Sequence, residues 1–221
     1  MDFVITGDGS KTLFNAEIGE CYHSKHGALQ ESKHVFIQMG LDFYVKHSGL
    51  QKVSVLEIGF GTGLNFLQTA EYVSGSDILV DYVGIEGYPL PLSVIKDTGY
   101  NAYVDPLIWN SFTENYTQSL DRSLSVTENM NLHIADTLLM DFTSDKQFDV
   151  VYFDAFAAVH QPEMWSDEAL GHIAQYIKPG GVFVTYAITG NLKRSMKALG
   201  FQIEKAPGAP GKREMLRAIK Y

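Results

Sequence analysis

The segment Val55-Leu56-Glu57-Ile58-Gly59-Phe60-Gly61-Thr62-Gly63 decides the fold. The apolar run 53–58 predicts a buried strand that ends at a glycine, and 62–73 predicts a helix. Glycines in such a turn let the backbone approach a ligand closely, and they open the N-terminus of the following helix. Leu64 stands where a dinucleotide fingerprint would have its third glycine, so the pattern is acid-x-Gly-x-Gly-x-Gly. The alternative is a tight turn that binds nothing.

Strands and helices alternate along the rest of the chain. This alternation predicts a mostly parallel sheet with helices on both faces. The last two strands can pair antiparallel, because a short loop rich in Gly and Pro joins them. The predicted strands are 53–58, 78–85, 131–135, 148–153, 182–187, 201–204 and 215–219, and the predicted helices are 31–47, 62–73, 91–99, 164–177 and 191–199.

We therefore expect an α/β fold with a Rossmann-like, mostly parallel seven-stranded sheet and an antiparallel C-terminal strand. About fifty residues precede the first core strand, so we expect 1–50 to be an N-terminal extension packed on the core and 51–221 to be the domain that carries the glycine turn. The weakly periodic segment 100–128 predicts a helical insertion between the second and third core strands.

Two acidic residues follow successive predicted strands: Glu86 ends the second strand and Asp136 ends the third. Ligands of open α/β sheets bind at the carboxyl ends of the strands, where a carboxylate can accept both hydroxyls of a ribose. We expect Glu86 to bind a ribose and Asp136 to accept a hydrogen bond from an adenine amino group. The glycine pattern resembles the first motif of class I methyltransferases, which implies S-adenosyl-L-methionine as the cofactor.

The fourth predicted strand, 148–153, delivers Asp154 to the same edge of the sheet. Methyltransferases place residues that face the transferred methyl group at this position. A carboxylate there suits a basic aliphatic amine, which is mostly protonated at pH 7 and must lose its proton before it attacks. Burial shifts the pKa values of both groups towards the neutral pair, so Asp154 can bind, orient and deprotonate the amine. The structural alternative for Asp154 is a helix cap.

Longer motifs make the chain resemble the methyltransferase domain of the MnmC family and its stand-alone relatives, called MnmD. The glycine pattern followed by Leu64-Asn65-Phe66 is far more specific than the bare turn. The other matching motifs are Cys21-Tyr22-His23-Ser24, Gly27-Ala28-Leu29-Gln30-Glu31-Ser32 with Val35-Phe36, Tyr152-Phe153-Asp154-Ala155-Phe156, Pro162-Glu163-Met164-Trp165 and Gly211-Lys212-Arg213-Glu214-Met215-Leu216.

The resemblance implies methylation of the amine of 5-aminomethyl-2-thiouridine at the tRNA wobble position, giving 5-methylaminomethyl-2-thiouridine. It implies that Asp154 is catalytic and contacts the amine, and we expect no flavin domain in this chain. The residues expected to bind the cofactor are Tyr22, Glu31, Glu57, Gly59, Phe60, Gly61, Gly63, Asn65, Glu86, Asp136 and Asp154, and those expected to bind tRNA are Phe156, Trp165, Lys212 and Arg213. Trp165 has the alternative role of packing, because it stands at helical spacing beside apolar residues.

Charge is distributed unevenly along the chain. The formal net charge is −9, but 178–221 carries nine Lys and Arg against two acids, a net +7, which leaves −16 on the rest. This asymmetry favours a basic face that contacts the anticodon region of a tRNA. The alternatives are ordinary solvated lysines and, for Arg213, a structural ion pair with Glu204 across the closing hairpin.

Composition sets wider limits. Hydrophobic residues make up 45% and charged residues 19%, which is ordinary for a globular protein. No apolar run is long enough to span a membrane, no signal peptide is visible, and Cys21, the single cysteine, is expected to be a buried structural thiol. We expect a cytoplasmic protein without a metal site or membrane partner, with a monomer slightly favoured.

Two other functions compete with tRNA methylation. A small-molecule amine transferase, such as a polyamine aminopropyltransferase, uses an acid at the same strand but would not explain the basic C-terminal segment. A binding module without catalysis is the other, although Glu86, Asp136 and Asp154 are all present. Methyl transfer to a tRNA that lacks the wobble methyl group would separate the three.

Overall fold

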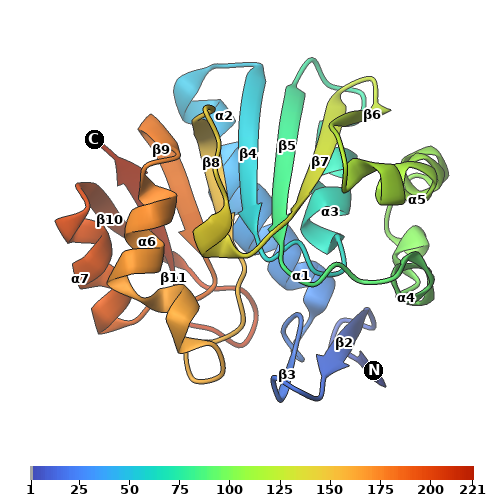
Figure 1. The fold of residues 1–221 in the computed structure, drawn as a ribbon, viewed down its shortest axis with the longest axis horizontal. Coiled ribbons are helices and arrows are strands. Elements are labelled where there is room, and N and C mark those ends of the chain that lie inside the picture. The colour runs from blue at the N-terminus through green and yellow to red at the C-terminus, as the bar shows by residue number, and fades with distance from the viewer. Residues whose placement is uncertain (1) are drawn as a thin grey trace.

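The core of the molecule is one eight-stranded sheet (Figure 1). The computed structural model describes residues 2–221. The strands are β4 (Lys52–Ile58), β5 (Leu79–Glu86), β6 (Leu124–Thr127), β7 (Met130–Asp136), β8 (Phe148–Phe153), β9 (Ile177–Thr185), β10 (Phe201–Pro207) and β11 (Glu214–Lys220). Five of them run parallel in the order β9-β8-β4-β5-β7, while β11 and β10 extend one edge antiparallel and β6 extends the other.

The predicted fold class is confirmed, with one strand more than the seven expected. The additional strand is β6, which lies in the segment predicted as a helical insertion. That segment forms η2 (Tyr100–Ala102) and α5 (Pro106–Ser119), then returns along β7 with an irregular register. A strand of four residues is too short for an alternating pattern to reveal. The helix does begin as its sequence predicts, because Asp105 accepts the Leu107 N–H at 2.7 Å just before Pro106.

Another boundary differs from the prediction at the start of β9. The sequence predicts a helix over 164–177, but the segment divides into the 3₁₀ helix η4 (Pro162–Trp165) and the helix α6 (Asp167–Ala174). Strand β9 then begins at Ile177 and passes through a bulge opposite β8. Gly180 has φ 77°, so the glycines that follow the predicted helix form an irregularity within a strand.

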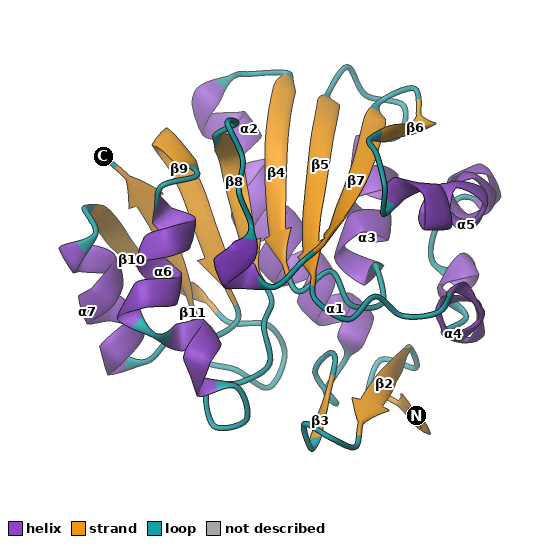
Figure 2. Ribbon diagram, in the orientation of Figure 1, coloured by secondary structure: helices purple, strands orange, loops and turns teal. Residues whose placement is uncertain are grey.

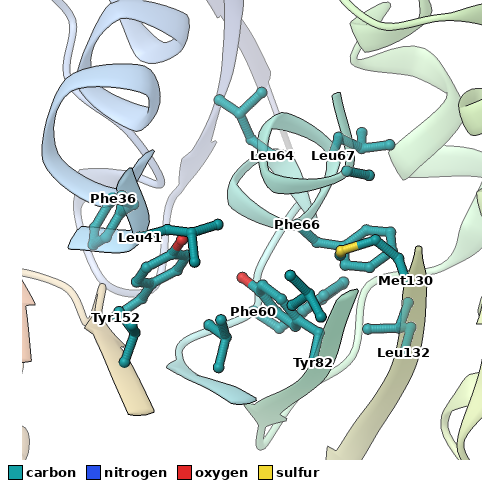
Figure 3. Close-up of a cluster of buried hydrophobic side chains, with 14 of the residues drawn as sticks. Phe36, Leu41, Phe60, Leu64, Phe66, Leu67, Tyr82, Met130, Leu132 and Tyr152 are labelled. Carbon is teal, nitrogen blue, oxygen red and sulfur yellow. The ribbon is translucent and has the colours of Figure 1, made fainter. Parts of the chain in front are cut away.

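Helices cover both faces of the sheet (Figure 2). One face packs against α3 and its neighbours, and Figure 3 shows Phe36, Phe66 and Tyr152 in this cluster. The other face packs against α6 and α7. Strand β8 is buried along its whole length, as expected for a parallel strand between two helical layers. The remaining core helices are α3 (Leu64–Val73), α4 (Leu92–Asp97), η3 (Leu139–Asp141), η4 (Pro162–Trp165), α6 (Asp167–Ala174) and α7 (Gly190–Ala198).

The first fifty residues add a small sheet and a helical segment. Strands β1 (Asp2–Ile5), β2 (Lys11–Asn15) and β3 (Glu20–Cys21) form a separate antiparallel sheet. It lies beyond the carboxyl ends of β4 and β5 (Figure 1). The helical segment is α1 (Ala28–Glu31), the π-helix η1 (Ser32–Asp42) and α2 (Phe43–Ser48). The sequence predicts this helix but neither its π geometry nor the small sheet. The division at residue 50 stays a prediction.

No helix among residues 2–221 is long and apolar enough to cross a membrane.

Candidate active site

The glycine turn has a conformation that only glycine adopts easily. Gly59, Gly61 and Gly63 have φ values of 83°, 51° and 77°, in the left-handed region. A Cβ on Gly59 would lie 2.7 Å from the carbonyl oxygen of Asp154, and one on Gly61 would lie 2.9 Å from the Tyr22 ring. The turn therefore lies tightly between the end of β8 and Tyr22.

Glu86 and Asp136 lie side by side at the ends of β5 and β7, where they pair in register. Oε2 of Glu86 accepts the Gly61 N–H at 2.8 Å, and Oε1 accepts the Tyr88 N–H at 3.0 Å. Burial raises the pKa of Glu86, although these hydrogen bonds oppose the rise. Asp136 is exposed. The sequence correctly places both acids beside the glycine turn, and their contact with a cofactor stays a prediction.

Three side chains expected to contact the cofactor are buried. Glu57 is fully buried, and its oxygens accept from Tyr82 Oη at 2.7 Å and Asn65 Nδ2 at 2.8 Å. Phe60 is 2% exposed and packs near Phe66, as Figure 3 shows. The side chains of Glu57, Phe60 and Asn65 therefore support the turn from inside the protein, and their expected contact with the cofactor stays a prediction.

Asn65 joins the two buried carboxyl groups of the site. Its Nδ2 donates to Glu57 and also to Oδ2 of Asp154, at 2.7 Å. Its Oδ1 accepts from Ser32 Oγ at 2.6 Å, which ties the network to η1. One amide thus fixes the orientation of Asp154 from the side that faces the core.

Asp154 is held in the protonated range at neutral pH. Its side chain is 6% exposed, and Asn65 is its one hydrogen-bond partner among residues 2–221, which leaves Oδ1 free for another donor. Burial raises the pKa of Asp154 to about 8; the negative charge of Glu31 adds to the rise, while Asn65 and Lys212 oppose it. Such a carboxyl group is poised to exchange a proton near pH 7.

His23 belongs to the site, although no spacing pattern in the sequence assigned it a role. Its Nε2 lies 2.8 Å from Oγ1 of Thr62 in the glycine turn, and its Nδ1 lies 3.9 Å from Oδ2 of Asp154. Burial lowers the pKa of His23 to about 4, so the ring is neutral at pH 7. The only sequence signal for it was its place within the motif Cys21-Tyr22-His23-Ser24.

A cavity of about 350 Å³ opens next to this group. Tyr22 and Phe156 meet edge to face in its wall, with ring centroids 5.1 Å apart. Cys21 is buried, as expected, and also lines the cavity. The lining residues are Gly19, Glu20, Cys21, Tyr22, His23, Ser24, Lys25, Glu31, Ala155, Phe156, His160, Tyr186 and Lys212.

The predicted tRNA residues separate into different environments. Trp165 donates from Nε1 to the Phe156 carbonyl at 2.8 Å and packs against Phe153, so it has the packing role that the sequence left as an alternative. Lys212 points into the cavity and forms an ion pair with Glu31 at 2.7 Å. Arg213 is exposed.

The ion pair considered for Arg213 belongs to a different arginine. Glu204 accepts from Arg217 Nε at 2.7 Å, and these two residues face each other in the register of β10 and β11. Antiparallel pairing sets the partner of each residue, and an arginine before the start of β11 cannot lie opposite Glu204. Arg213 is therefore not the structural partner of Glu204.

The fold and this site define a class of protein. A family model described as S-adenosyl-L-methionine-dependent methyltransferase matches residues 106–221. The chain belongs to this family, and its cofactor is S-adenosyl-L-methionine.

Particular relatives narrow the comparison. The chain is similar to the tRNA 5-methylaminomethyl-2-thiouridine biosynthesis bifunctional protein MnmC of Leptospira interrogans, with 31% identity over 96% of this chain and 34% of the relative. The MnmC protein of Pseudomonas savastanoi is 29% identical, and the match covers 91% of this chain and 32% of the relative. The chain spans about a third of the length of these curated relatives.

Solved structures share the fold. MnmC2 from Aquifex aeolicus superposes with a TM-score of 0.76 at 22% identity, covering 98% of this chain and 69% of that chain. DesVI from Streptomyces venezuelae gives a TM-score of 0.52 at 12% identity, and the match covers 87% of this chain and 92% of that chain. These likenesses support the fold class predicted from the glycine turn.

The residues present fit the cofactor of the family. At Gly61 only a hydrogen atom faces the Tyr22 ring, so this aromatic ring lies directly against the backbone of the turn. Glu86 offers carboxylate oxygens to a ribose, and the exposed Asp136 lies beside it at the end of the next strand. The site thus combines a cradle for a nucleoside with a carboxyl group at the end of β8.

Proposed function

We propose that this protein methylates the primary amine of 5-aminomethyl-2-thiouridine at the wobble position of tRNA. The observation that carries the proposal is Asp154, a buried carboxyl group with a free oxygen and a pKa of about 8, at the strand end beside the glycine turn. Such a group matches an acceptor that arrives as an ammonium and must lose a proton. The names of the MnmC relatives point to the same product.

Three groups of the chain would hold the cofactor. The backbone of Gly59–Gly63 would lie along it, Glu86 would bind the ribose hydroxyls, and Asp136 would accept from the adenine amino group. When bound, S-adenosyl-L-methionine supplies a methyl group on a positively charged sulfur. The Tyr22 ring lies against the turn at Gly61 and lines the adjacent cavity.

The ionised form of Asp154 binds the acceptor and takes its proton, and the positive charge of the entering ammonium favours that form. Oδ1 accepts an N–H of the entering ammonium, while Asn65 keeps Oδ2 in place. The pKa of a free alkylammonium is about 10.4, so raising the pKa of Asp154 narrows the difference between donor and acceptor. The nitrogen that has lost its proton to Asp154 can then take the methyl group. His23, neutral because burial lowers its pKa to about 4, adds no competing charge.

The acidic wall of the cavity supports an amine acceptor of more than one kind. Glu20 and Glu31 both line it, and either suits a free polyamine as well as a nucleoside amine. The small-molecule amine transferase therefore remains the second candidate function.

Acceptor competition separates the two functions. Labelled S-adenosyl-L-methionine would be mixed with tRNA that carries 5-aminomethyl-2-thiouridine, with the same tRNA lacking the aminomethyl group, or with spermidine. We expect label in the first tRNA alone. Label in spermidine and none in either tRNA would replace the proposal with the small-molecule function.

A further inference from the structure

The cavity already contains an ammonium group, that of Lys212. Its Nζ donates to Oε2 of Glu31 at 2.7 Å and lies 4.0 Å from the centroid of the Tyr186 ring. The Glu31 side chain is only 6% exposed, while that of Lys212 is 32% exposed. We call the Glu31 carboxylate and the Tyr186 ring the ammonium cage. A carboxylate beside an aromatic face is the arrangement that recognises alkylammonium ions.

The cage is fixed independently of Lys212. The other oxygen of Glu31, Oε1, accepts the Ser24 N–H at 3.1 Å. The Tyr186 hydroxyl donates to the Ala155 carbonyl at 2.9 Å. Lys212, in contrast, reaches the cage from the loop between β10 and β11 on a side chain of four flexible carbons. The cage can therefore stay in place when the lysine leaves.

We propose that the ammonium cage is a binding subsite for an alkylammonium ligand and that Lys212 fills it until such a ligand displaces it. The proposal deepens the proposed function and rests on it for the identity of the ligand. A cationic ligand replaces one positive charge with another, so the buried Glu31 stays paired. A neutral ligand that displaced Lys212 would leave Glu31 buried and uncompensated, which is costly. The exchange therefore selects cations over neutral molecules of the same shape.

The same exchange of cations also keeps a positive charge close to Asp154. Burial is the main cause of the raised pKa of Asp154; the charges of Glu31 and Glu20 add to the rise, and the charge of Lys212 opposes it. The facing His23 is neutral at pH 7. A ligand cation in the cage preserves the one favourable charge that acts on Asp154 when Lys212 leaves.

Two ligands of the proposed reaction carry an alkylammonium group: the methionine part of the cofactor and the aminomethyl group of the acceptor. Both have the chemistry that the cage recognises. Calorimetry on Lys212→Gln distinguishes them, because each has a neutral or truncated counterpart.

The first arm compares S-adenosylhomocysteine with 5′-methylthioadenosine, which lacks the amino-acid part. If the cage takes the cofactor ammonium, Lys212→Gln binds S-adenosylhomocysteine about tenfold tighter than wild type, because no cation must first leave Glu31. Its affinity for 5′-methylthioadenosine should equal that of wild type.

The second arm uses protein saturated with S-adenosylhomocysteine. If the cage takes the acceptor, 5-aminomethyluridine gains about tenfold and 5-hydroxymethyluridine gains nothing.

Matched variants make the result specific. Lys25→Gln removes the same charge from the same cavity wall, and we expect no gain in affinity there because Lys25 does not pair with Glu31. Glu31→Gln should weaken binding of the favoured ammonium ligand about tenfold in the wild-type background, and should cancel the gain in Lys212→Gln.

One outcome overturns the proposal. If Lys212→Gln, or Lys212→Met should that variant fold better, melts at a lower temperature and gains no affinity for either ammonium ligand, the ion pair is only a structural tie. The measurements need no methyl transfer. Tighter ammonium binding without methylation of tRNA would therefore reject the proposed function and leave the cage intact.

Discussion

At the scale of single residues, the site depends on how the protein holds the proton of Asp154. Within residues 2–221, the one hydrogen bond to its carboxyl group comes from Asn65, and the carboxylates of Glu31 and Glu20 lie near enough to oppose its ionisation. Burial is the main reason that its pKa rises from an ordinary value of about 3.9 to about 8, and the two carboxylates add to the rise. The raised pKa lowers the stability of the fold at neutral pH, and it also lets the group exchange a proton near that pH.

The raised pKa makes stability depend on pH. Between about pH 4 and pH 8 the folded state holds a proton on Asp154 that the unfolded chain has released, so the free energy of unfolding falls as pH rises through this window. Asp154→Asn removes this effect. We expect the variant to be more stable than wild type at pH 8 by at least about 1 kcal/mol, or about 2–4 °C in Tm, with the difference lost below pH 4. Thermal melts across this range measure it.

Asp149 gives a matched control of opposite sign. Burial raises the pKa of Asp149, but hydrogen bonds from Lys178 and Ser54 outweigh burial and hold it below the ordinary value. Its contribution to stability is present above that ordinary value and lost as pH falls through the folded pKa. Asp149→Asn should therefore destabilise the protein at neutral pH. If both variants shift Tm in the same direction at pH 8, the charge assignment of Asp154 is wrong.

Glu86 is expected to contribute directly to cofactor affinity. Glu86→Ala removes two charge-assisted acceptors, so binding of S-adenosylhomocysteine should weaken by roughly 1.5–3 kcal/mol in calorimetry. Asp81→Ala, on the same strand but paired with Lys146 outside the site, should leave the affinity unchanged. Equal affinities of wild type and a folded Glu86→Ala protein would remove Glu86 from the cofactor site.

At the scale of elements, the glycine turn can be tested separately from backbone strain. Gly61 and Gly75 have similar positive φ values of 51° and 70°, but only a Cβ on Gly61 would collide, 2.9 Å from the Tyr22 ring. Each change to Ala costs about 1 kcal/mol or more of stability through left-handed strain. Only Gly61→Ala should also weaken binding of S-adenosylhomocysteine, by about tenfold. A comparable loss of affinity in Gly75→Ala would mean that general destabilisation is the cause.

The elements also show which parts of the fold and the site can be predicted from the sequence. Strands buried on both faces, such as β8, leave a mostly apolar run, which in β8 only Asp149 interrupts, and the acids that follow them mark the edge where ligands bind. The network of Asn65 and Glu57 leaves no such pattern, because its partners are distant in sequence and a polar residue in a helix reads as exposed. His23 was missed for the same reason, since only the tertiary fold brings it to Thr62 and Asp154.

At the scale of the whole molecule, the uneven charge must be reconciled with where the basic side chains lie. Lys212 points into the cavity, so it does not belong to an open phosphate-binding face in this conformation. Arg194, Lys197 and Arg213 are exposed. These three are the better candidates for contacts with a tRNA backbone.

Their role appears in the salt dependence of tRNA binding. Each phosphate contact releases counterions, so replacing Arg194, Lys197 and Arg213 by Ala should weaken binding and flatten the slope of log affinity against log salt by about one unit per lost contact. Lys146→Ala removes an exposed lysine from the acidic part of the chain and should leave the slope unaltered. A triple variant with the wild-type slope would show that the basic side chains of 178–221 are ordinary solvated cations.

The central claim is that Asp154 binds the amine and takes its proton, and single-turnover methyl transfer to tRNA by Asp154→Asn tests it most directly. Asparagine keeps the shape and can still accept from Asn65, but it lacks the charge and basicity of the carboxylate. We expect the rate to fall by about two or more decades, the range for a lost general base. The affinity for S-adenosylhomocysteine, measured alongside, should change much less. A wild-type rate in Asp154→Asn would contradict the account.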